Sequence, residues 1–102
     1  MAVVHSIVYK AFPGKQAAMM TRMNASKAIV EKHGLEARIL VNVAGGPTAG
    51  TVMFVLSCED TAAWGQKFQA VNQDPEFQKV QAAMADSPNG DMLSSTIWMD
   101  AP

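Results

Sequence analysis

The sequence has few of the residues that hold metals or cofactors. It contains one cysteine and two histidines in 102 residues, so Cys58 has no partner for an internal disulfide. The two histidines do not lie one helical turn apart, which is a spacing that metal sites use. The glycine-rich segment 44–50 lacks both the G-x-G-x-x-G pattern and the lysine of a phosphate-binding loop. We therefore expect neither a metal nor a cofactor.

The chain also lacks an excess of one charge and any long apolar run. Its eight Lys and Arg residues are scattered and the formal net charge is −1, so there is no basic stripe to neutralise phosphates and nucleic acid is not an expected partner. No apolar run approaches the ~18 residues of a membrane span, and the first residues do not resemble a secretory signal. We expect a cytoplasmic protein that does not enter the membrane.

What is present is a regular succession of strands and helices. A chain of 102 residues allows one hydrophobic core, so residues 1–102 are expected to form a single domain. The second and third strands are separated by the 44–50 loop and should form an antiparallel hairpin. Runs rich in β-branched and aromatic residues predict strands at 3–10, 35–43, 51–58 and 92–99.

Helical signals lie between the first and second strands and between the third and fourth strands. Pro13 suits a first helical turn, and His33-Gly34 should close that helix because Gly readily takes the left-handed conformation. Asp60 and the Asp74-Pro75-Glu76 motif each provide an oxygen-bearing cap, so the second helical region should be broken into two helices. The order β-α-β-β-α-β predicts an α+β fold, the ferredoxin-like four-stranded antiparallel sheet with its helices on one face.

The other face of this sheet is too apolar for water. In the third strand, Met53 and Val55 alternate with residues that would face the helices, and strict alternation in the last strand places Met92 on the same face as Thr96 and Trp98. A fully buried large apolar side chain contributes about 1.5–3 kcal/mol. We therefore expect a homodimer that pairs through these sheet faces.

The order of elements and the opening segment His5-Ser6-Ile7-Val8-Tyr9-Lys10 resemble the dimeric α+β barrel superfamily. The first strand is similar to that of stress-responsive α/β-barrel domains and related polyketide cyclases. The Phe12-Pro13-Gly14-Lys15 turn and the stretch from Trp64 to Phe77 resemble antibiotic-biosynthesis-type monooxygenases and NIPSNAP-like proteins. The resemblance covers nearly the whole chain and implies sheets that pack face to face, with a cavity in each subunit.

The resemblance stops at the residues that perform chemistry in two branches of the superfamily. Its cyclases and its haem-degrading monooxygenases carry a functional histidine in the second helical region. Here the corresponding segment 71–77 reads Val-Asn-Gln-Asp-Pro-Glu-Phe. Neither activity is carried over to this chain.

Candidate site residues come from all four strands. His5 shares a strand face with Tyr9, and its neutral imidazole could act as a general base, or could simply hydrogen-bond a neighbour. By resemblance it faces the cavity, whereas a one-residue bulge would send it to the helix side. Arg38 could clamp a carboxylate or enolate, or form an ion pair with Glu36 or with a partner subunit. The expected ligand pocket comprises His5, Tyr9, Arg38, Asn42, Thr51, Met53, Thr96 and Trp98. For Asn42, Thr51, Thr96 and Trp98, the alternative is a semi-polar dimer interface.

These observations favour a homodimeric α+β barrel that binds a small, mostly apolar organic molecule in a cavity between the sheet and the partner. The alternative is a cofactor-independent monooxygenase or cyclase/isomerase, in which His5 is the base and Arg38 or Asn42 steadies a developing oxyanion. A third hypothesis is a structural or interaction domain whose cavity is filled by side chains.

Overall fold

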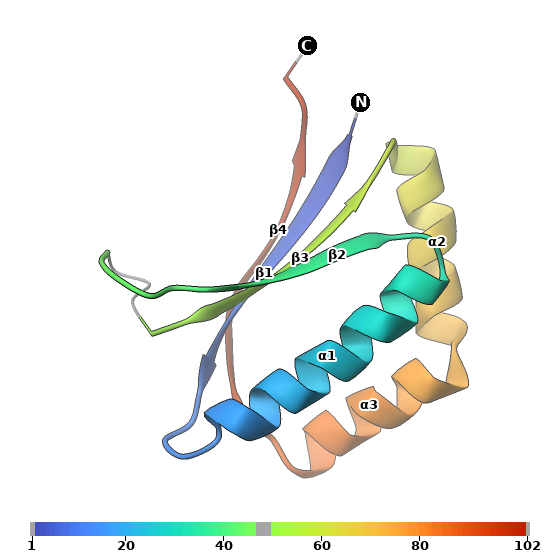
Figure 1. Ribbon diagram of the computed structural model, residues 1–102. Helices are drawn as coiled ribbons and strands as arrows, with labels where there is room; N and C mark the ends of the chain where they lie inside the picture. The colour runs from blue at the N-terminus through green and yellow to red at the C-terminus, as the bar shows by residue number, and fades with distance from the viewer. Residues whose placement is uncertain (1, 47–49, 102) are drawn as a thin grey trace.

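The computed structural model describes residues 2–46 and 50–101, so part of the expected 44–50 loop lies outside the described residues. The sheet has the order β2-β3-β1-β4 and every neighbouring pair is antiparallel. Figure 1 shows the helices on one side of this sheet. The predicted ferredoxin-like α+β arrangement is confirmed. Its elements are β1 (Val3–Ala11), α1 (Gln16–Lys32), β2 (Glu36–Val41), β3 (Val52–Cys58), α2 (Thr61–Gln73), α3 (Pro75–Asp86) and β4 (Gly90–Met99).

The entry into α1 differs from the prediction. The helix begins at Gln16, and Pro13 with Gly14 instead forms a turn in which the Phe12 carbonyl accepts a hydrogen bond from the Lys15 N–H at 2.9 Å. Gly14 has φ 78°, which suits the third position of a type II turn after proline. The placement of Pro13 in the first helical turn is therefore wrong.

The helix boundaries that depend on local chemistry are confirmed. Gly34, with φ 88°, follows the end of α1 and donates its N–H to the Glu31 carbonyl at 3.0 Å. The Asp60 carboxylate caps α2 by accepting from the Ala63 N–H at 2.7 Å. The Asp74 carboxylate caps α3 by accepting from the Glu76 N–H at 2.8 Å. The second helical region is thus broken at Asp74, as predicted.

Asp74 also ties the break between α2 and α3 to the end of α1. Its carboxylate lies 2.7 Å from both Lys32 Nζ and His33 Nε2. Hydrogen bonds from Lys32, which has the larger effect, and from His33 hold the pKa of this carboxyl well below its usual range. These contacts link the start of α3 to the end of α1, and α3 forms part of the wall of the cavity described below.

The hydrophobic core lies between the sheet and the helices. Its most buried members are Val30 from α1, Leu35 just before β2, Leu56 from β3 and Val71 from α2, all at most 2 % exposed. Trp64 and Phe68 pack on this core from α2, with stacked rings 4.7 Å apart. Within the described part of the chain, none of the helices combines the length and apolar composition needed to cross a membrane.

A bulge alters the register of β4 against β1. Val8 faces Ser94, but Tyr9 faces Met92, so Leu93 is the additional residue. Met92 therefore shares the helix-side face with Tyr9, whereas strict alternation had placed it with Thr96 and Trp98. That placement of Met92 is wrong because one bulged residue reverses the parity of all residues before it.

Candidate functional site

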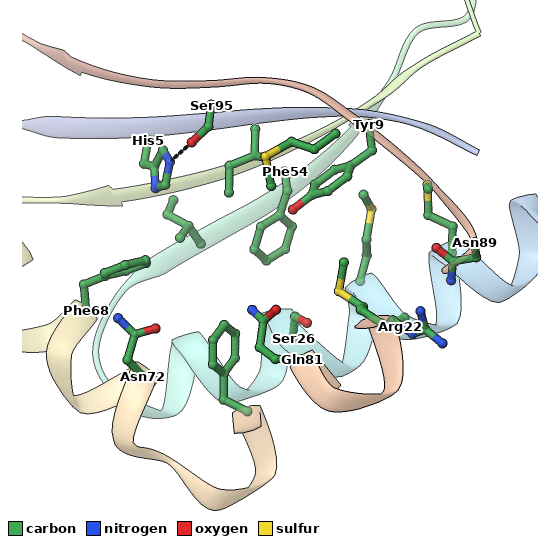
Figure 2. Close-up of a pocket in the computed structure, with 17 residues that line it drawn as sticks. His5, Tyr9, Arg22, Ser26, Phe54, Phe68, Asn72, Gln81, Asn89 and Ser95 are labelled. Carbon is green, nitrogen blue, oxygen red and sulfur yellow. Dashed lines mark hydrogen bonds between the residues drawn. The ribbon is translucent and has the colours of Figure 1, made fainter. Parts of the chain in front are cut away.

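A cavity of about 230 Å³ lies between the sheet and the helices. Figure 2 shows side chains from the strands above it and from the helices below it. The wall is mostly apolar, and β1, β3, β4, α1, α2 and α3 contribute to it. Its methionine and phenylalanine side chains are Met19, Met23, Met84, Met92, Phe54, Phe68 and Phe77.

His5 provides the titratable group at one end of this cavity. The side chain is 7 % exposed, and its Nε2 forms a hydrogen bond of 2.8 Å with Ser95 Oγ. The rings of Trp64 and Phe68 meet the imidazole edge-to-face, with centroids 5.9 and 6.0 Å away. The buried Nδ1 has no hydrogen-bond partner among the described residues. Burial lowers the pKa of His5 from 6.5, so the imidazole is neutral at pH 7 and retains a basic nitrogen.

Tyr9 lies farther along the same face of β1. Figure 2 shows its side chain extending into the cavity. Burial raises the pKa of the Tyr9 phenol from 10.0, so it is protonated at pH 7 and can donate a hydrogen bond to a ligand.

The other six predicted site residues lie on the opposite face of the sheet. His5 pairs with Leu56, which faces the helices, while Arg38 pairs with Val55, the neighbour of Leu56 on the other face. The structure therefore does not bring the predicted pocket together. The residues separated from His5 and Tyr9 are Arg38, Asn42, Thr51, Met53, Thr96 and Trp98.

The open face of the sheet contains a smaller hollow of about 130 Å³. Asn42, Thr51 and Met53 line it together with Val8 and Leu40. Arg38 is exposed, and the described part of the chain gives it no ion pair with Glu36. The ion pair considered for Arg38 within the chain is thus not formed.

The cavity also contains polar side chains that the sequence did not reveal. Arg22 and Ser26 are four residues apart on α1, and they share a helix face with the buried Met19 and Met23. This spacing was the signal that could have identified them. The remaining polar lining residues are Asn72, Gln81, Asn89 and Ser95. Ser95 lies after the bulge in β4, so simple alternation along the strand already placed it on the helix side.

Solved structures of low sequence identity resemble this chain over nearly its full length. A NIPSNAP domain protein from Burkholderia xenovorans is 16 % identical, with 97 % of this chain and 94 % of that chain covered and a TM-score of 0.76. SnoaB, a cofactor-independent oxygenase from Streptomyces nogalater, is 11 % identical, with coverages of 99 % and 94 % and a TM-score of 0.70. A Chloroflexus aurantiacus protein, named as a candidate antibiotic biosynthesis monooxygenase, is 10 % identical, with coverages of 100 % and 95 % and a TM-score of 0.68.

The chain has the ferredoxin-like α+β fold of these proteins. No protein-family model matches the sequence, and no curated protein matches it. In this ferredoxin-like chain, the largely apolar cavity has a neutral histidine at one end, and a neutral imidazole is a group that can act as a general base.

Proposed function

We propose that the protein binds a small, mostly apolar organic molecule in the cavity between the sheet and the helices. The observation that supports this most directly is the wall itself, in which methionine and phenylalanine side chains surround a few separated polar groups. Ligand pockets commonly have this composition, because apolar surface supplies affinity and isolated polar groups fix orientation. The open volume of about 230 Å³ also argues against an interior that side chains fill.

A substitution that fills the cavity tests this proposal. Ser26 lines the cavity from α1, whereas its neighbour Ala25 is exposed. Ser26→Phe should reduce the affinity for the neutral fluorescent probe 2-naphthol by at least about tenfold, because the added ring occupies ligand space. Ala25→Phe adds the same ring on the solvent side and should leave the affinity unchanged. Equal affinity in the two variants, measured by fluorescence titration, would place the binding elsewhere and contradict the proposal.

A second candidate function is favoured by the position of His5. Its neutral imidazole lies at one end of a mostly apolar cavity, with a hydroxyl partner in Ser95. Such a group can remove a proton from an acidic C–H or O–H bond of the ligand. SnoaB, which has the same fold, is named a cofactor-independent oxygenase. The candidate is therefore a cofactor-independent monooxygenase or a cyclase/isomerase in which His5 is the base.

For the assembled state, the proposal is a homodimer that pairs through the open faces of two sheets. That face carries Leu40, 39 % exposed, and Trp98, 60 % exposed, and none of the helices in the described residues covers it (Figure 1). Two copies related by a twofold axis would bury both side chains against equivalent surfaces.

A further inference from the structure

We propose that the ligand of the cavity is a monocarboxylate with an apolar body, whose carboxylate pairs with Arg22. This inference rests on the proposed function, because it names the class of molecule that the same cavity takes. It concerns the end of the cavity opposite His5, where Figure 2 shows the side chains of Arg22 and Asn89.

The charge of the cavity wall favours an anion. Arg22 is the one charged residue that lines it within the described part of the chain, and neither Asp nor Glu contributes to the wall. His5, the other basic side chain present, is neutral at pH 7 because burial lowers its pKa. A single cation in a cavity whose wall is otherwise uncharged attracts a ligand with one negative charge and repels cationic molecules.

The guanidinium of Arg22 has N–H donors that are available to a ligand. Its Nη1 donates one hydrogen bond, to the Ser87 carbonyl at 3.2 Å. It forms no ion pair with the described residues. Since a guanidinium carries five N–H donors in a planar fork, most remain for a ligand. A carboxylate matches this fork with two parallel hydrogen bonds, which a neutral amide cannot reproduce.

Asn89 adds an unsatisfied donor at the same end. The residue is 7 % exposed, and its Nδ2 is buried without a hydrogen-bond partner in the described part of the chain. The backbone carbonyl of Asn89 accepts a hydrogen bond from the Phe12 N–H at 2.9 Å, which holds the backbone in place at this position. Buried donors are rarely left unpaired, and each one costs free energy. A carboxylate oxygen beside Arg22 provides the acceptor that this amide lacks.

The half-buried position of Arg22 also limits the cost of holding an anion. A carboxylate near the cavity rim keeps part of its hydration, whereas one deep among methionine and phenylalanine side chains would lose it. The apolar body then extends along those side chains towards His5 and Ser95. The structure thus orients the ligand, with the anionic end at Arg22 and the distal end at the neutral imidazole.

A pair of matched probes tests the assignment. At pH 7, 3-phenylpropanoate is an anion and 3-phenylpropanamide is its neutral counterpart of similar size. Isothermal titration calorimetry should find that the unmodified protein binds the carboxylate at least about tenfold more tightly than the amide, because a charge-assisted pair is stronger than a neutral hydrogen bond. Arg22→Gln should abolish this preference while retaining amide binding. Lys79→Gln, which removes a cation from the exposed side of α3, should preserve it.

The outcomes separate this inference from the proposed function. Equal affinity of the unmodified protein for both probes would overturn the role of Arg22 and leave the apolar cavity as a binding site, and that comparison requires no variant to fold. A preference that persists in Arg22→Gln would also overturn it. If neither probe binds the unmodified protein, the proposed function itself fails for this ligand class, and the inference fails with it.

Discussion

His5 is the residue whose environment departs most from that of a free side chain. It is buried between Ser95 and the rings of Trp64 and Phe68. Removing the imidazole from water disfavours its charged form. The structure therefore lowers the pKa of His5 below its ordinary value of 6.5.

We predict that the pKa of His5, measured by NMR titration of its ring protons, lies below 6.5. An unfolded chain binds a proton at about pH 6.5, whereas the folded chain binds it only at lower pH. The contribution of His5 to the free energy of unfolding is therefore fully present above 6.5 and is lost as the pH falls through the folded-state pKa. His5→Gln should lack this component. A pKa at or above 6.5 would contradict the assigned burial.

The same variant distinguishes binding from catalysis. If His5 is a general base, oxygen consumption or product formation with a phenolic or enolisable ligand should disappear in His5→Gln, while the ligand is still bound. The rate should be constant above 6.5 and should fall at lower pH, where the imidazole becomes charged. Turnover that survives in His5→Gln would remove the enzymatic candidate in its present form.

The sequence correctly indicated the neighbours of His5 along β1, because side chains of a strand alternate between two faces. The sequence did not indicate which side chains of the neighbouring strands lie beside His5, because strand pairing joins residues that are distant in the sequence. Arg38 was grouped with His5 on that account, although pairing through Val55 puts it on the other face. Arg22 was overlooked because an arginine on a helix is normally solvated, and its position in the cavity depends on how α1 packs.

At the scale of the elements, most signals that act within a few residues were interpreted correctly, and the placement of Pro13 in a helix was the exception. Asp60 and Asp74 cap α2 and α3 because their carboxylates reach N–H groups two or three positions later. The bulge in β4 was not predicted, since it depends on the register between β1 and a strand that lies about 90 residues later. The bulge brings Met92 to the cavity and so changes the site as well as the strand.

The start of β4 depends on the absence of a side chain at Gly90. A Cβ atom there would meet the Met19 methyl group, the Lys10 carbonyl and the Ala11 Cα. We predict that Gly90→Ala lowers the free energy of unfolding by about 1–3 kcal/mol, because it overpacks the junction of β1, β4 and α1. Urea unfolding followed by circular dichroism would measure this change.

Gly65 is the matched control for that substitution. It lies within α2, and a Cβ there would have no neighbour within 4 Å. Gly65→Ala should therefore raise stability by about 0.5–1 kcal/mol, through helix propensity alone. If both variants were stabilised, β4 would not approach β1 and Met19 as closely as described.

At the scale of the whole molecule, the sheet has helices on one face and the proposed dimer contact on the other. We predict that Leu40→Arg shifts the protein from dimer to monomer, because the twofold axis places the two introduced charges near each other in an apolar contact. Native mass spectrometry over a range of protein concentrations would follow the shift. Ala28→Arg, at an exposed position of α1, should leave the assembly unchanged. An unmodified protein that is monomeric at every concentration would exclude this contact.

The overall fold was predictable because it follows from the succession of apolar periodicities and turn residues, which the sequence displays directly. The cavity could not be predicted in this way, because its wall comes from β1, β3, β4 and the three helices. The packing of these elements decides which polar side chains face the cavity. His5 and Tyr9 were expected beside a partner subunit. They line instead a cavity within one chain.

Four of the eight methionines in the sequence line this cavity. A methionine side chain is unbranched and polarisable, so a wall made of such chains can adjust its shape to ligands that differ in outline. The same thioethers can be oxidised to sulfoxides, which are polar. Oxidation of Met19, Met23, Met84 or Met92 would replace adaptable apolar surface with hydrogen-bond acceptors, so the proposed binding of apolar molecules would depend on the redox state of the cavity wall.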